Sequence, residues 1–177
     1  LIQREAEHAR SGKPARLTFK VNSIADPRII RVLYEASQAG VQIDLIVRGV
    51  CCLRPGVPEI SENIRVHSIV GRFLEHSRIY SFENAGSPEV YIGSADLMER
   101  NLDRRVEVLT PVLAPSLRDH LREVVLQACL EDTECTFILQ RDGSYRRLTP
   151  EEVPASSCVH THLLEWYARR ERERVPE

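Results

Sequence analysis

The chain is organised around one stretch, Phe73-Leu74-Glu75-His76-Ser77-Arg78-Ile79-Tyr80-Ser81-Phe82-Glu83. Residues 77–82 alternate polar and apolar side chains and contain several β-formers, which predicts a strand. Because side chains on a strand repeat every two residues, we expect His76 and Arg78 to share one face. A titratable imidazole beside a permanent cation is typical of a site that holds an anion while a nitrogen attacks it or moves a proton.

A second stretch, Val90-Tyr91-Ile92-Gly93-Ser94-Ala95-Asp96, follows soon after. Its first three residues read as an apolar strand, and Gly93-Ser94 reads as a small-residue turn at the end of that strand. Taken alone, a His beside an Arg is more often a surface pair or a structural histidine. The turn favours the functional interpretation, because small residues let backbone amides approach a ligand closely.

The first part of the chain predicts a strand–helix–strand unit. Residues 16–21 alternate as a strand, and residues 41–47 form a short apolar strand. Between them, Asp26 can cap a helix over residues 27–38. Such a unit has parallel strands joined by a right-handed crossover. Arg48 then lies at the carboxyl end of a strand, where α/β sheets gather ligands; the alternative is a surface arginine in a loop.

The other elements follow from the same periodicities, and together they indicate the α/β class. Further strands are expected at residues 64–69 and 104–109, and a hairpin at residues 133–140 and 144–148. Helices are expected at residues 1–11, 97–101, 116–129, 149–152 and 159–174.

The five cysteines are odd in number and include the adjacent pair Cys51 and Cys52. That spacing is a poor disulfide framework and suits a reducing cytoplasm. No second Cys or His pair with ligand spacing lies near them, so we interpret both as buried, small apolar side chains. Cys158, His160 and His162 alternate, which could indicate a metal site. Because a fourth ligand is missing, we favour a tail helix with exposed histidines.

Length and charge restrict the class of protein. A chain of 177 residues is long enough for one domain with a core, or for one domain with a small appendage. The net charge of −2 gives no bias toward nucleic acid or membranes. No signal peptide is visible in these 177 residues, and no apolar run approaches the roughly 20 residues of a transmembrane helix. Because Leu1 lies inside a helical pattern, we expect a fragment of a longer protein.

The two stretches together resemble the phospholipase D superfamily, whose pattern is HxK, four residues, Asp, and a later GSxN. Here the first motif is His76-Ser77-Arg78, followed after four residues by Glu83, and the second is Gly93-Ser94-Ala95-Asp96. Arg replaces Lys, Glu replaces Asp, and Asp replaces Asn. One branch with Arg at the Lys position is polyphosphate kinase. Further strings resemble its C-terminal catalytic half, at residues 12–16, 21–23, 36–41, 43–49 and 73–78, so that the resemblance covers residues 1–148.

The resemblance implies a phospholipase D-like mixed β-sheet flanked by helices, with a C-terminal hairpin and a helical tail. Residues 1–148 would form the C-terminal catalytic domain, and residues 149–177 the charged helical tail. In that family the terminal phosphate of ATP passes reversibly to inorganic polyphosphate through a phosphohistidine on an upstream catalytic domain. That domain also supplies most contacts to Mg²⁺. Because it is missing here, we expect this chain to be inactive alone.

The implied partners are ATP or ADP, inorganic polyphosphate and the upstream catalytic domain, with no nucleic acid and with a homo-oligomeric full-length enzyme. A cytoplasmic location that includes the periphery of the inner membrane face is also implied. Other nucleotide signatures are missing, since the sequence has no GxxxxGK[ST] loop and no GxGxxG after a strand. Phosphates would therefore be held by cations and backbone amides.

The resemblance also assigns roles to individual residues. Arg48 would contact the nucleotide phosphates, and His76 would face the phosphorylated histidine as an acid–base or phosphate-orienting group. Arg78 and Ser94 would stabilise phosphate. Two alternatives stay open: a stand-alone phosphodiesterase or nuclease that acts as a homodimer, and a non-catalytic assembly module. The Arg at the Lys position disfavours the first, and the presence of the motif residues disfavours the second.

Overall fold

The computed structural model describes residues 1–148, 152 and 157–174, and a single mixed β-sheet runs through the described part. Its strands are β1 (Arg16–Val21), β2 (Gln42–Val47), β3 (Ile64–Ile69), β4 (Ile79–Phe82), β5 (Glu89–Gly93), β6 (Leu109–Pro111), β7 (Thr136–Leu139) and β8 (Tyr145–Arg147). Their spatial order is β6-β5-β4-β1-β2-β3-β7-β8. The central strands β1, β2 and β3 are parallel, and antiparallel strands extend the sheet on both sides.

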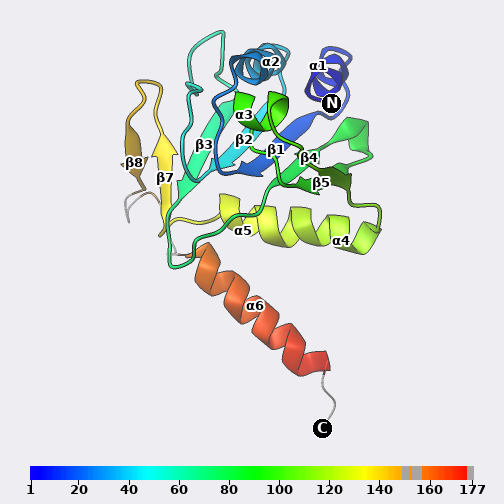
Figure 1. The fold of residues 1–177 in the computed structure, drawn as a ribbon, viewed down its shortest axis with the longest axis vertical. Helices are drawn as coiled ribbons and strands as arrows, with labels where there is room; N and C mark the ends of the chain where they lie inside the picture. Colours follow the sequence, from blue (N-terminus) through cyan, green and yellow to red (C-terminus); the bar gives the residue numbers. More distant parts are fainter. Residues whose placement is uncertain (149–151, 153–156, 175–177) are drawn as a thin grey trace.

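Helices cover both faces of this sheet, as Figure 1 shows. The helices are α1 (Ile2–Arg10), α2 (Pro27–Gln38), α3 (Glu99–Asp103), α4 (Pro115–Asp119), α5 (Gln127–Leu130) and α6 (Val159–Arg174), with a 3₁₀ turn η1 (Asn84–Gly86) and a π-helical segment η2 (His120–Leu126) between α4 and α5. α1 and α2 lie over one face, and the α4–α5 segment lies under the other (Figure 1). α6 continues away from the body, so the predicted α/β fold with a helical tail is confirmed.

The strand–helix–strand unit forms as its local signals predict. The Asp26 carboxylate accepts hydrogen bonds from the backbone amides of Arg28 (2.8 Å) and Ile29 (3.1 Å), and Pro27 opens the helix. Gly40 ends the turn after α2 with a φ of +93°, which favours glycine. Every residue of β2 after Gln42 is buried, because helices cover the sheet above and below it.

The strand predicted over residues 104–109 is wrong. The strand that forms is β6, and residues 104–108 belong to no strand or helix. Val106 is fully exposed, and the Glu107 carboxylate accepts hydrogen bonds from the Asn101 side-chain amide (2.6 Å) and the Ser94 hydroxyl. Polar and apolar residues alternate in this segment, but its apolar side chains have no buried surface to pack against. The segment therefore does not form a strand.

Two other elements begin later in the sequence than predicted. The helical turn predicted over residues 97–101 is α3, which begins at Glu99, because Leu97 is extended and bridges to Ile24. β4 begins at Ile79, so His76 and Arg78 precede the strand in a loop. The helix predicted over residues 149–152 lies outside the described residues, apart from Glu152.

Three side chains differ in burial from the prediction. Cys51 is half-buried and Cys52 is exposed. The backbone amide of Cys52 donates a hydrogen bond to the carbonyl oxygen of Ile24 at 2.8 Å, which holds this segment at the edge of the sheet. His160, on the first turn of α6, is 8% exposed rather than free in solvent. His162 is exposed, as predicted. Among the described helices, none combines the length and apolar character that crossing a bilayer requires.

Candidate phosphate site

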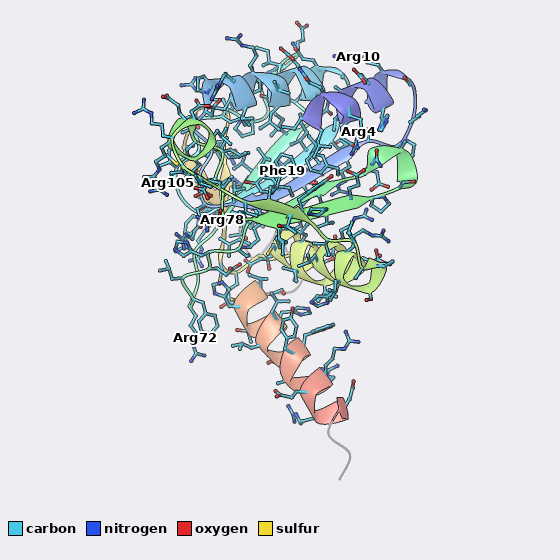
Figure 2. All side chains as sticks on the ribbon, turned by 45° about the vertical axis from the view of Figure 1, so that its right-hand side comes forward. Arg4, Arg10, Phe19, Arg72, Arg78 and Arg105 are labelled. Atoms are coloured by element: carbon cyan, nitrogen blue, oxygen red, sulfur yellow. The ribbon has the colours of Figure 1, made fainter. Side chains whose placement is uncertain are left out.

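The predicted site residues gather at one edge of the sheet. The parallel strands β1, β2 and β3 end at this edge, and β4 begins there because it runs antiparallel to β1. Arg48 directly follows β2, and Arg78 directly precedes β4. Figure 2 shows Arg78 on the same side of the molecule as Arg72 and Arg105, away from Arg4 and Arg10. Carboxyl ends of parallel strands are the usual ligand-binding edge of an α/β sheet.

Arg48 and His76 are in contact. The Nη2 atom of Arg48 lies 3.3 Å from Nε2 of His76, and its Nη1 donates to the carbonyl oxygen of Glu75 at 2.8 Å. Because a guanidinium only donates, His76 accepts through Nε2 and its neutral form carries the proton on Nδ1. Arg48 is half-buried, whereas the His76 ring is exposed. The two side chains therefore meet at this edge of the sheet, and their roles stay predictions.

Arg78 is held by a buried carboxylate. Its Nε and Nη2 atoms donate to the two oxygens of Asp96 at 3.3 and 3.1 Å, and its Nη1 donates to the backbone oxygen of His76 at 2.9 Å. Asp96 also accepts from the backbone amides of Asn22 (2.7 Å) and Ser23 (3.3 Å). Burial acts to raise the pKa of Asp96, but the Arg78 fork and these amides outweigh it, so the pKa lies below its usual range.

The segment before His76 is fixed by an ion pair that the sequence analysis missed. Lys20 is 8% exposed and its ammonium contacts the Glu75 carboxylate as well as the Ser77 hydroxyl at 2.9 Å. Glu75 in turn accepts from the amide and the hydroxyl of Ser77, both at 2.8 Å. Burial acts to raise the pKa of Glu75, but these donors lower it to about 2. His76 is therefore held between two anchored neighbours.

The available signals for these partners were weak but present. Lys20 lies within a strand whose neighbours are apolar, and a lysine inside a covered sheet needs a counter-charge. Asp96 lies at the last position of the GSxN pattern, and its negative charge complements the Arg at the Lys position. A spacing pattern alone does not reveal that these two departures contact each other.

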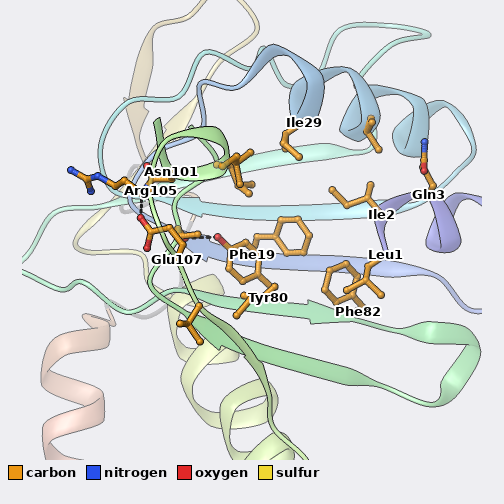
Figure 3. A pocket seen from close by; sticks show the side chains of 16 residues that line it. Leu1, Ile2, Gln3, Phe19, Ile29, Tyr80, Phe82, Asn101, Arg105 and Glu107 are labelled. Atoms are coloured by element: carbon orange, nitrogen blue, oxygen red, sulfur yellow. Dashed lines mark hydrogen bonds between the residues drawn. The ribbon is translucent and has the colours of Figure 1, made fainter. Parts of the chain in front are cut away.

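Ser94 is not joined to Arg48 or His76 by any contact among the described residues. Its hydroxyl donates to Glu107 and accepts from the backbone amide of Val108 at 3.2 Å. Glu107 also lines a wide pocket of about 590 Å³ near Phe19, Tyr80 and Phe82 (Figure 3). That pocket is mostly apolar and contains neither Arg48 nor His76, so it is separate from the candidate phosphate site.

The carboxylates beside His76 and Arg78 are paired with cations. Glu75 and Asp96 are engaged with Lys20 and Arg78, respectively. The only described group of three potential metal ligands is formed by Asp132, Cys135 and Cys158, and thiols are poor ligands for Mg²⁺. The expectation that Mg²⁺ is held mainly by another domain stays a prediction.

Similarity to known proteins places this chain in a family. The family model described as polyphosphate kinase C-terminal domain 2 matches residues 1–158. Curated polyphosphate kinases from Thermosynechococcus vestitus and Pseudomonas aeruginosa are 57% and 56% identical over 164 and 165 residues, which is 93% of this chain but only 22% and 24% of those proteins. The chain thus spans less than a quarter of the length of these relatives.

Solved structures agree with the sequence matches. The crystal structure of polyphosphate kinase from Porphyromonas gingivalis superposes with a TM-score of 0.89 at 39% identity, covering 97% of this chain and 26% of that one. The phospholipase D family member Nuc from Salmonella typhimurium superposes with a TM-score of 0.51 at 16% identity over 81% of this chain and 89% of that one, which shows the fold alone. The chain therefore belongs to the polyphosphate kinase C-terminal domain family and has a phospholipase D-like fold.

Proposed function

We propose that this chain is the C-terminal catalytic half of a polyphosphate kinase. In this proposal the terminal phosphate of ATP is transferred reversibly to inorganic polyphosphate through a phosphohistidine on an upstream domain of the full-length enzyme. Family membership supports the reaction, and the small share of the relatives' length that the chain spans supports the need for another domain. The chain alone is then inactive.

The observation that carries the proposal is the contact between Arg48 and His76 at the carboxyl edge of the sheet. Phosphoryl transfer needs an in-line nucleophile, positioning and charge stabilisation, with little other covalent help from the protein. Arg48 stays charged, and its planar guanidinium can bind phosphate oxygens through the donors that Glu75 and His76 leave available. We assign Arg48 to the phosphates of the nucleotide.

His76 supplies an imidazole, which can hold or move a proton. Its exposed ring is open to a phosphate carried on a facing domain. In the proposal it holds or moves a proton at the transferred phosphate, or orients one of the phosphate oxygens, and the upstream histidine is the nucleophile. The Lys20–Glu75 pair contributes by fixing the backbone on either side of His76.

Arg78 and Ser94 complete the proposed site. Most donors of Arg78 are used by Asp96 and by the His76 backbone, so its contribution is a fixed positive charge and support for the His76 loop. Ser94 presents an exposed hydroxyl at the end of β5. Mg²⁺, held mainly by the upstream domain, would shield phosphate charge. The further partners that we propose are ADP and other copies of the full-length enzyme, without nucleic acid, in the cytoplasm or at the inner membrane face.

Turnover of the full-length enzyme tests the proposal. His76→Ala should lower the rate of polyphosphate synthesis by roughly 10²–10⁴-fold, the usual contribution of general acid–base catalysis. His76→Gln should fail nearly as badly if proton transfer is the role, because it keeps a donor but does not titrate. His162→Ala is the matched control, since His162 is exposed on α6. Near-normal turnover of a folded His76→Ala enzyme would rule the assignment out.

A further inference from the structure

Two cysteines outside the phosphate site lie unusually close together. Cys135 directly precedes β7 and Cys158 directly precedes α6, and their sulfur atoms are 2.8 Å apart although 23 positions separate them in the sequence. Both side chains are half-buried, and neither contacts Arg48 or His76 in the described part of the chain. The proposed phosphoryl transfer gives these thiols no role.

The separation of the sulfurs favours a covalent bond over a metal site. Thiolates on a tetrahedral zinc ion, with bonds of about 2.3 Å, lie roughly 3.7 Å apart, whereas a disulfide bond is about 2.05 Å long. The third potential ligand is Asp132, whose two oxygens already accept from the amides of Cys135 and Val159, both at 2.7 Å. Asp132 therefore acts as a brace between the two segments.

The backbones that carry the cysteines are fixed relative to each other. The amide of Thr133 donates to the oxygen of Ser157 at 2.9 Å, and the amide of Ser157 donates back to the Thr133 hydroxyl at 3.1 Å. Together with the Asp132 brace, these bonds bring the two cysteine positions together before any covalent bond forms. Closure then requires the sulfurs to approach by less than about 1 Å.

We propose that Cys135 and Cys158 form an intramolecular disulfide when a low-molecular-weight disulfide such as oxidised glutathione is present, and that this bond fixes the start of α6 against the loop that carries His76. One cysteine thiolate attacks the glutathione disulfide, forming a mixed disulfide and releasing one reduced glutathione. The second thiol loses its proton, attacks the protein sulfur of the mixed disulfide and releases the other. Two protein thiols are oxidised, and one glutathione disulfide is reduced to two thiols.

His160 links this bond to the phosphate site. It lies two residues after Cys158, and its Nδ1 accepts a hydrogen bond from the backbone amide of Phe73 at 3.2 Å, with the two rings 5.4 Å apart. His160 also lines a small cavity of about 50 Å³ together with Arg48 and Glu75. A bond between Cys135 and Cys158 therefore restrains the residue that holds the His76 loop.

Attack by the Cys135 sulfur should be slow near neutral pH. Burial raises the pKa of Cys135 to about 12, so its thiolate is scarce. The thiolate is the attacking form, and crosslinking should accelerate as the pH rises.

The test uses the 177-residue chain. It is treated with excess oxidised glutathione at about pH 8.5, where more thiolate is present, and digested without reduction. We expect a peptide pair joined through Cys135 and Cys158, a rise in Tm of about 5–10 °C, and amide exchange at Phe73 slowed by about tenfold or more. Cys52→Ser, which removes an exposed thiol, should leave all three results unchanged, and Cys158→Ser should abolish them.

Three outcomes would overturn the proposal. The first is the absence of a Cys135–Cys158 crosslink while Cys52 reacts with glutathione. The second is stoichiometric zinc binding by the reduced chain that Cys158→Ser abolishes, which would make the pair a metal site. The third is a crosslink that leaves exchange at Phe73 unchanged, which would separate the bond from the His76 loop.

Discussion

Arg78 and Asp96 show how two departures from a motif can compensate each other. The superfamily pattern has Lys and Asn at these positions, whereas this chain has a guanidinium paired with a buried carboxylate through two hydrogen bonds. The fork of an arginine matches the two oxygens of a carboxylate, which a lysine cannot do. The sequence reveals both substitutions, but only the fold shows that they form one interaction.

For Arg48, shape matters as well as charge. Arg48→Lys in the full-length enzyme keeps the positive charge but loses the planar pair of donors. We expect the KM for ATP to rise by about 10–100-fold, the range for losing a charged hydrogen bond, with a smaller change in kcat. Arg54→Lys, in an exposed loop, is the control. A lowered kcat with an unchanged KM would place Arg48 at the transition state instead of at nucleotide binding.

The lowered pKa of Glu75 predicts that the stability of the chain depends on pH. Its folded-state pKa of about 2 lies below the ordinary 4.5, so the unfolded chain binds more protons between these values. The stabilisation is fully present above pH 4.5 and is lost as the pH falls through about 2. Thermal unfolding of this chain should therefore show a steeper loss of Tm below pH 4.5 than unfolding of Glu75→Gln.

At neutral pH, Glu75→Gln should destabilise the chain by about 1–3 kcal/mol, because the Lys20 ammonium loses its counter-charge. Glu62→Gln, in an exposed position with no ion pair among the described residues, is the matched control. Parallel pH profiles for Glu75→Gln and the unsubstituted chain would show that the ion pair contributes nothing to stability.

At the scale of elements, local signals decided which predictions succeeded. The helix over residues 27–38 forms because its cap, its first proline and its closing glycine all act locally. The strands at residues 16–21 and 64–69 have the predicted bounds. The segment at residues 104–108 had an alternating pattern without a partner surface, and the loop around His76 is shaped by Lys20 and His160 from distant parts of the chain. Neither outcome can be read from local sequence.

The close fit of this loop against α6 predicts the effect of Gly71→Ala. An added Cβ would lie 2.5 Å from Nδ1 of His160 and 3.3 Å from the Cys135 sulfur. The imidazole must shift, which weakens its bond to Phe73, and we expect a loss of about 1–3 kcal/mol from overpacking. A double-mutant cycle with His160→Ala measures this by chemical denaturation. Additive effects of the two substitutions would show that Gly71 and His160 do not interact.

At the scale of the whole molecule, the sheet brings residues from separate segments to one edge. The parallel pairing of β1 with β2 was predicted from the strand–helix–strand unit. Arg48 and His76 are close together because both adjoin strand ends at this same edge of the sheet. The supporting residues Lys20, Glu75 and Asp96 were missed, because their contacts depend on how β4 pairs with β1. Contacts between sequence-distant residues decide the finer geometry of the site.

The central claim is that His76 supports phosphoryl transfer and that the nucleophile lies on an upstream domain. The most direct measurement is the phosphoenzyme formed by full-length His76→Ala with ATP labelled in its terminal phosphate, in a protein shown to be folded. We predict that the upstream histidine is labelled to nearly the normal extent, while polyphosphate synthesis falls by roughly 10²–10⁴-fold. Loss of the label together with activity, with the upstream histidine intact, would contradict this account, because His76 would then be the nucleophile or essential to forming the phosphoenzyme.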